Sequence, residues 1–153
     1  MSQIKRVLSF FLLLFAQSLM AQQTVTLKVV IDSIQSLKGN ILVAVYNNKG
    51  EYKNSKAFQL KKTKVSGSMV TTTFKLPTNT NYAIALFQDI NQNDTLDTKG
   101  SMKIPTEPFG FSNNKKGTFG PPGFDKIMFT MTADTTITVH LISSRKSYLQ
   151  KEN

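Results

Sequence analysis

The sequence contains no cysteine and only one histidine. Without cysteine the chain cannot form disulfide bonds, thiolate metal sites or a cysteine nucleophile. A single histidine, His140, excludes a histidine-rich metal centre, and no nucleophile-elbow motif accompanies it. No glycine-rich phosphate-binding loop is present either. The sequence therefore predicts a protein that is not an enzyme.

Acidic residues are scarce as well, with 9 Asp and Glu against 19 Lys and Arg, and the formal net charge is +10. A basic protein can bind an anionic glycan or another anionic component of the cell envelope. Its lysines are spread along the chain without interleaved aromatic residues, which argues against nucleic acid as a partner. A solvated surface that keeps the protein soluble would explain the same charge without any partner.

Long hydrophobic runs are limited to the N-terminus. Lys5 and Arg6 precede an almost wholly apolar run over 7–15, and small residues follow up to Ala21. The run is shorter than the roughly 20 residues of a membrane-spanning helix. This layout is typical of a secretory signal peptide over 1–21, cleaved after Ala21, and an uncleaved anchor is the alternative. We therefore expect export to the periplasm or the extracellular space.

The remaining chain has the pattern of one all-β domain over 22–144, followed by a polar tail over 145–153, with no transmembrane segment. Residues 24–31 alternate between polar and apolar side chains, as in a strand with one wet face. Residues 41–46 and 82–87 are apolar throughout, as in central strands that are covered on both faces. Further strands are predicted at 57–65, 70–76, 126–132 and 135–143. About seven strands predict an immunoglobulin-like or prealbumin-like β-sandwich, with a long ordered loop over 89–125.

The first part of this loop places oxygen-bearing side chains at alternate positions. Positions one, three, five and nine carry Asp or Asn, and the residue at position seven offers its backbone carbonyl. Calcium takes 6–8 oxygen ligands, and a tightly wound loop of this kind supplies them. The candidate metal ligands are Asp89, Asn91, Asn93, Thr95 and Asp97.

Two positions depart from the pattern of a strong calcium loop. Asp94 stands at the sharp turn where glycine is usual, although Asp tolerates left-handed geometry better than most residues. Gly100 stands where a bidentate Glu is usual, and Asp97 or Glu107 could substitute for it. We therefore expect weak affinity, of about 10⁻⁴–10⁻³ M. The alternative is a loop held by the Asx-turns of its own Asp and Asn residues, without a metal.

The second part of the loop, 104–125, holds four of the five prolines and four of the eleven phenylalanines. Proline and glycine together specify a defined backbone path. The aromatic rings either cover the second face of a central sheet or form an exposed surface for a ligand such as a glycan or a peptide. The residues concerned are Glu107, Phe109, Phe111, Asn113, Phe119 and Phe124.

Three segments together resemble a known bacterial family. They are Gln-Asp-Ile-Asn-Gln-Asn-Asp-Thr-Leu-Asp (88–97), Ile-Pro-Thr-Glu-Pro-Phe-Gly-Phe-Ser-Asn-Asn (104–114) and Phe-Gly-Pro-Pro-Gly-Phe-Asp (119–125). The chain is similar to the "domain of unknown function 2141" family over nearly its whole mature length. It departs from that family at Gln88, where His is usual, and at Asp94, where Gly is usual. The resemblance implies no activity, and the first departure puts histidine-dependent chemistry in doubt.

We therefore expect a non-enzymatic exported binding module, with calcium as its one candidate cofactor. The first alternative is a structural or envelope-associated module without a small-molecule ligand. The second is a hydrolase that uses a carboxylate pair. Its candidates would come from Asp89, Asp97, Glu107 and Asp125.

Overall fold

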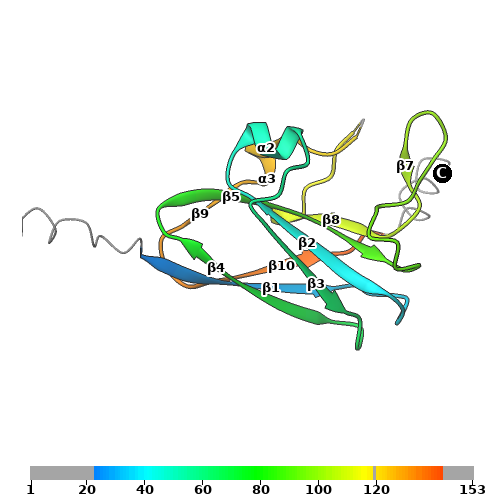
Figure 1. The fold of residues 1–153 in the computed structure, drawn as a ribbon, viewed down its shortest axis with the longest axis horizontal. Helices are drawn as coiled ribbons and strands as arrows, with labels where there is room; N and C mark the ends of the chain where they lie inside the picture. The colour runs from blue at the N-terminus through cyan, green and yellow to red at the C-terminus, as the bar shows by residue number, and fades with distance from the viewer. Residues whose placement is uncertain (1–22, 119, 143–153) are drawn as a thin grey trace, which may run out of the picture.

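The computed structural model describes residues 23–118 and 120–142, which form a sandwich of two β-sheets (Figure 1). The predicted signal peptide, the polar tail and Phe119 lie outside the described residues. The strands are β1 (Thr24–Asp32), β2 (Asn40–Tyr46), β3 (Gln59–Lys64), β4 (Val70–Pro77), β5 (Thr80–Asp89), β6 (Thr98–Lys99), β7 (Ile104–Pro105), β8 (Phe109–Phe111), β9 (Phe129–Met131) and β10 (Thr135–His140). The helices are α2 (Lys49–Lys53), the 3-10 turn η2 (Ser112–Asn114) and α3 (Phe124–Ile127). The prediction of an all-β sandwich is confirmed.

The first sheet has the strand order β10-β1-β4. Its middle strand, β1, buries every second residue, so the two-residue period predicted its buried face correctly. At its centre Val29 lies opposite Ile137 of the parallel strand β10 and Thr72 of the antiparallel strand β4. The chain forms β2 and β3 of the second sheet between β1 and β4, and it adds β5, β8 and β9 before β10 completes the first sheet.

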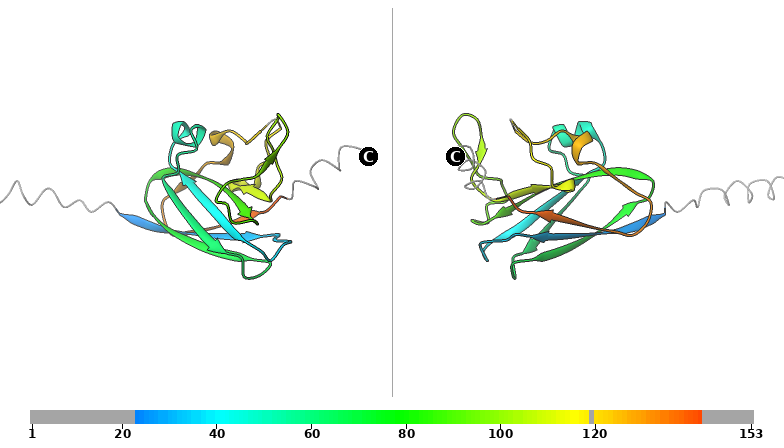
Figure 2. Two further views of the ribbon diagram at one scale, coloured as in Figure 1. Left: turned by 45° about the vertical axis from the view of Figure 1, so that its right-hand side comes forward. Right: turned by 180° about the vertical axis from the view of Figure 1, so that it is seen from behind.

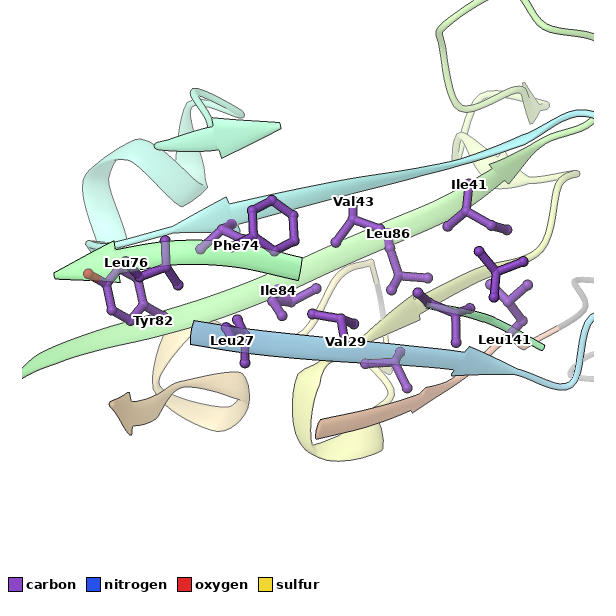
Figure 3. Packing of buried hydrophobic residues seen from close by; sticks show 14 of the residues in the cluster. Leu27, Val29, Ile41, Val43, Phe74, Leu76, Tyr82, Ile84, Leu86 and Leu141 are labelled. Atoms are coloured by element: carbon purple, nitrogen blue, oxygen red, sulfur yellow. The ribbon is translucent and has the colours of Figure 1, made fainter. Parts of the chain in front are cut away.

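The second sheet has the order β3-β2-β5-β8, and β9 pairs with the opposite end of β5. The two strands that contain the apolar runs 41–46 and 82–87, β2 and β5, are central in it, as predicted. The main core fills the space between the two sheets (Figure 3). Leu27 and Val29 of β1 face Val43 of β2 and Ile84 of β5 there, and all four are fully buried.

A second apolar cluster covers the outer face of β2 and β5. Phe111 of β8 joins Phe124 and Ile127 of α3, and they pack with Tyr46 and Ala83 of the sheet. Figure 2 shows α2 and α3 side by side over this face. We call these elements, α2, β8 and α3, the cover. The cover explains why β2 and β5 are apolar on both sides.

Three local predictions were incomplete. The 89–125 segment contains β8, whose three residues pair with β5 and are too few to show a period. The first two residues of the strand predicted over 126–132 are the last two residues of α3, and the segment is a strand only over β9. A short helix, α2, forms between the strands predicted at 41–46 and 57–65, where no element was predicted. The Asn48 side chain caps it by accepting from the Glu51 N–H (2.9 Å). Within the described part of the chain, no helix is long and apolar enough to cross a membrane.

Candidate metal centre in the 89–97 loop

The loop begins at Asp89, the last residue of β5, whose side chain is fully buried. Its Oδ1 accepts a hydrogen bond from the Asn93 N–H (3.0 Å), and its Oδ2 accepts one from the Asp94 N–H (2.9 Å). A carboxylate bonded to two successive amides pulls the chain back toward the strand that it has just left. Asp89 therefore fixes the winding of the whole loop.

Two asparagines continue this winding as Asx-turns. The Oδ1 of Asn91 accepts from the Asn93 N–H (3.2 Å), and the Oδ1 of Asn93 accepts from the Thr95 N–H (2.9 Å). Gln92 and Asp94, each with φ at 63°, adopt the left-handed conformation that such a tight path requires. Asp94 thus takes at the sharp turn the geometry that glycine would take.

Three side chains of the loop converge on one point. Asn91 donates through Nδ2 to Asp97 Oδ2 (2.7 Å), and Asn93 donates through Nδ2 to Asp97 Oδ1 (3.1 Å). Both carboxylate oxygens of Asp97 therefore accept hydrogen bonds from side-chain amides, whose hydrogens carry a partial positive charge. The structure brings three of the five predicted ligand residues together, and the side-chain amides of Asn91 and Asn93 face the Asp97 carboxylate.

Glu107 connects the two ends of the loop through hydrogen bonds to their backbone amides. This side chain is only 5% exposed, accepting from the Ile90 N–H at Oε1 (2.8 Å) and from the Asp97 N–H at Oε2 (3.1 Å). Because both oxygens are bonded to backbone amides, its role in this geometry is to position the loop. Lys62 of β3 forms an ion pair with Asp94 from the neighbouring sheet edge.

The donor chemistry of the loop suits calcium, which prefers carboxylate, amide and carbonyl oxygens. No group of three or more His, Cys, Asp and Glu side chains comes together anywhere in the described residues. A cation here would therefore depend on the amide oxygens of Asn91 and Asn93 and on the Thr95 carbonyl, together with Asp89 and Asp97. These residues fit a site of low affinity.

Three of the four predicted phenylalanines lie on the cover, and Phe119 lies outside the described residues. Phe111 and Phe124 are buried, and Phe109 is partly buried with its ring 5.9 Å from that of Phe111 in an edge-on arrangement. These three rings pack on the outer face of the second sheet. They do not form an exposed aromatic surface for a ligand.

Sequence reasoning missed the role of the Ser-Asn-Asn turn that follows β8. The buried Ser112 Oγ accepts from the Ile84 N–H (2.9 Å) and donates to the Ile127 carbonyl (2.5 Å). Asn113 donates through Nδ2 to the Met128 carbonyl (3.0 Å). Asn114 accepts from the His140 N–H (2.9 Å) and thereby caps the free edge of β10. The turn joins both sheets and α3, and only its place in a family-like segment pointed to it.

The family model described as "Uncharacterized protein conserved in bacteria (DUF2141)" matches residues 29–140. The chain belongs to this family. The match extends from β1 to β10 and includes the 89–97 loop, Glu107 and the Ser-Asn-Asn turn. No curated protein and no solved structure matches the chain.

Gln88 stands at the position where the sequence departs from the His that is usual in DUF2141 proteins. Its side chain is fully buried beside the loop. Its Nε2 donates to the carbonyls of Ser36 (2.7 Å) and Lys38 (2.8 Å). Its Oε1 has no hydrogen-bond partner in the structure. Gln88 thus joins the β1–β2 connection to β5. Its side chain lies on the inter-sheet face of β5 together with Ile84 and Leu86, and so points away from the converging side chains of the 89–97 loop.

His140 and Asp125 of this DUF2141 chain have partners outside the 89–97 loop. His140 is exposed, and its Nδ1 lies 2.5 Å from Asp32 Oδ1 on the neighbouring strand. Asp125 forms an ion pair with Lys49 (2.9 Å) between α3 and α2. Asp125 is therefore separated from the carboxylates of the loop.

Proposed function

We propose that this DUF2141 protein is a non-enzymatic binding module of the periplasm or the extracellular space whose 89–97 loop binds Ca²⁺ weakly. The observation that carries the proposal is the convergence of Asn91, Asn93 and Asp97 on one point. Two amide N–H groups there provide the positive partial charge that a cation would supply more strongly. The N-terminal segment with the layout of a signal peptide supports the exported location.

The residues that would hold the ion are Asp89, Asn91, Asn93, Asp97 and the carbonyl of Thr95. The side-chain oxygens of Asp89 and Asn91 each accept one backbone N–H and keep a second lone pair for a further partner. Asn93 Oδ1 accepts both the N–H and the hydroxyl of Thr95, so it would release the hydroxyl on binding the ion. Ca²⁺ would neutralise two carboxylates that lie on the same nine-residue loop. Its effect would be to stiffen the loop on the end of β5.

The surroundings of the carboxylates support a non-enzymatic role. General acid-base work requires a carboxyl group that can reach a substrate and exchange a proton. Asp89 and Glu107 are buried and each accepts two backbone amides, while Asp125 pairs with Lys49 at a different place. In this proposal Asp89 winds the loop and binds the ion, whereas Glu107 and Asp125 have structural roles.

Thermal unfolding of the purified protein with and without about 10 mM Ca²⁺ tests the proposal, since the expected dissociation constant is about 1 mM or lower. Binding to the folded state alone should add about 1.4 kcal/mol and raise the melting temperature by a few degrees. Asp97→Asn removes one charge from the centre of the loop and should remove most of the rise. Mg²⁺, which demands a smaller octahedral site, should have a weaker effect.

Asp125→Asn is the matched control, because it removes a carboxylate outside the loop and should leave the calcium response unchanged. Equal responses of the two variants, or no response of the wild-type protein, would reject the ion site. The structural module without a ligand would then be the better description. The burial of Phe111 and Phe124 in the cover favours that second candidate.

A further inference from the structure

The two sheets of the sandwich have four edges, formed by β10 and β4 in the first sheet and by β8 and β3 in the second. Asn114 occupies the edge of β10, where it accepts from the His140 N–H (2.9 Å) and donates to the Thr138 carbonyl (3.1 Å). At the edge of β8, Phe109 exchanges two backbone hydrogen bonds with Ile142. The chain itself therefore occupies these two edges at positions where another strand would pair.

Side chains of β3 occupy the edge of β4. Gln59 donates through Nε2 to the Lys75 carbonyl (3.0 Å). Lys61 donates through Nζ to the Thr73 carbonyl (2.5 Å), and the same nitrogen lies 5.3 Å from the ring centroid of Phe74. Inward-pointing polar and charged side chains of this kind block the addition of a strand at a sheet edge. β3 thus closes the edge of β4, and its own edge is the one that remains.

The edge of β3 presents a row of backbone groups without partners. The Val65 N–H donates to the Gly39 carbonyl (3.1 Å), so in the antiparallel register the odd-numbered residues of β3 bond to β2. The N–H and C=O groups of the even-numbered residues point away from β2, at the border of the second sheet (Figure 1). No hydrogen bond reaches these groups within residues 23–118 and 120–142. The even-numbered residues are Leu60, Lys62 and Lys64.

The side chains along this edge are basic. β3 carries three lysines among its six residues and no acid. Lys62 pairs with Asp94, whereas Lys64 forms no ion pair in the described part of the chain. Leu60 is 60% exposed and lies on the same face as these two lysines, opposite Ala44 of β2. One strand therefore combines unpaired backbone groups, positive charge and an exposed apolar side chain.

Charge decides which kind of strand can pair with this edge. A second copy of β3 would set the lysines of one chain beside those of the other, and like charges opposite each other destabilise a strand pair. A strand with acidic residues opposite Lys62 and Lys64 gains attraction in addition to the backbone hydrogen bonds. An apolar residue opposite Leu60 adds a contact on the same face.

We propose that β3 binds an extended acidic segment of another protein as an additional, antiparallel strand of the second sheet. The antiparallel direction continues the pairing of β3, β2, β5 and β8. Backbone hydrogen bonds hold the segment, and Lys62 and Lys64 select acidic residues in it. The proposal does not rest on the calcium site, and its test is carried out with a chelator present, so either can fail alone.

Fluorescence anisotropy of a labelled synthetic peptide tests the proposal with the purified protein. The peptide Glu-Thr-Glu-Thr-Leu places its two glutamates opposite Lys64 and Lys62 and its leucine opposite Leu60. It should bind, and added salt should weaken the binding. The same peptide with lysine in place of glutamate should bind about tenfold more weakly. N-methylation of both glutamates removes N–H groups that face β3 and should weaken binding by a similar factor.

A protein variant and its control test the position of the site. Lys64→Glu should weaken binding of the peptide about fivefold, since it turns an attraction into a repulsion. Lys28→Glu is the matched control and should leave binding unchanged, because Lys28 is an exposed lysine in the middle of β1 in the other sheet. Circular dichroism verifies that both variants are folded.

Amide hydrogen exchange gives a second readout on the wild-type protein. Without peptide, the N–H groups of Leu60, Lys62 and Lys64 should exchange faster than those of Gln59 and of the other odd-numbered residues of β3. Saturating peptide should slow the exchange of the three even-numbered amides about tenfold or more.

Four results would overturn the proposal. The first is the absence of binding by the glutamate peptide, and the second is equal binding by its lysine or N-methylated form. The third is binding that leaves the exchange of the three amides unchanged. The fourth is a dimer in sedimentation velocity in which these amides are already protected, because the occupant of the edge would then be a second copy of this chain.

Discussion

Glu107 is the buried acid on which the geometry of the 89–97 loop depends, since it bonds the Ile90 and Asp97 amides at the two ends. Glu107→Gln keeps the shape of the side chain but turns an N–H donor toward one of these amides. Hydrogen bonds to a charged group contribute about 1.5–3 kcal/mol, so we expect a loss of about 2 kcal/mol in the free energy of unfolding. Urea denaturation at neutral pH measures it.

Glu51→Gln is the control for this change, because Glu51 lies on the surface of α2 with Lys56 4.0 Å away. Surface ion pairs of this kind contribute about 0–1 kcal/mol. If the two variants lost similar amounts of stability, the assignment of Glu107 as a structural clamp would be wrong.

Gly110 lies in the middle of β8, where the strand approaches β10 most closely. A Cβ atom there would lie 2.7 Å from Val139 Cγ1 and 3.0 Å from the His140 carbonyl oxygen. Gly110→Ala should therefore destabilise the fold by about 1–3 kcal/mol through overpacking. Gly123→Ala is the matched control, since its Cβ would meet nothing within 4 Å and its φ of −65° suits alanine. Chemical denaturation of both variants distinguishes a packing requirement from a general glycine effect.

At the scale of elements, the attachment of α2 to the cover should be sensitive to alkaline pH. The Tyr52 hydroxyl donates to the Pro122 carbonyl (2.8 Å), and the ring packs edge-on against Tyr46 at 5.1 Å. Burial, with a smaller contribution from Tyr46, raises the pKa of Tyr52 from 10.0 to about 12. Because the folded-state pKa lies above the unfolded one, this contribution to stability is complete below pH 10 and is lost as the pH rises toward 12.

The free energy of unfolding should therefore fall between pH 10 and 12, and Tyr52→Phe should make that fall shallower. Tyr46 and Tyr82 leave some dependence in the variant, since burial raises the pKa of each as well. Denaturant unfolding measured from pH 9 to 12 checks the slope. An unchanged slope in Tyr52→Phe would contradict the assignment.

At the scale of the whole molecule, two apolar clusters share one sheet. The main core and the cover lie on opposite faces of β2 and β5. Loss of either cluster would therefore expose an apolar face of these two strands to water. Phe124→Ala, in the cover, should cost about 3–5 kcal/mol, as large-to-small changes of buried aromatics do. We expect one cooperative transition, shifted to lower denaturant concentration, when circular dichroism and tyrosine fluorescence are compared.

Phe58→Ala provides the comparison, because Phe58 is 40% exposed at the start of β3 and its replacement should cost clearly less. Two separate transitions in Phe124→Ala would mean that the cover unfolds as its own unit. The sandwich would then be stable without it.

The sequence by itself determined the fold class and most of the central strands. Polar and apolar residues alternate along β1 and β4, and the central parts of β2 and β5 are apolar throughout. Such patterns show in neighbouring residues of one strand which faces are buried, so they can be read from the local sequence. It also identified the residues that converge in the 89–97 loop, because Asx-turns act over two to five positions along the chain.

Tertiary structure alone decided the rest, because the contacts concerned join residues far apart in the chain. The strand character of β8 comes from its pairing with β5, and the need for glycine at 110 comes from the approach of Val139. Ser112 and Asn114 acquire their roles only when Ile84, Ile127 and His140 are brought to them.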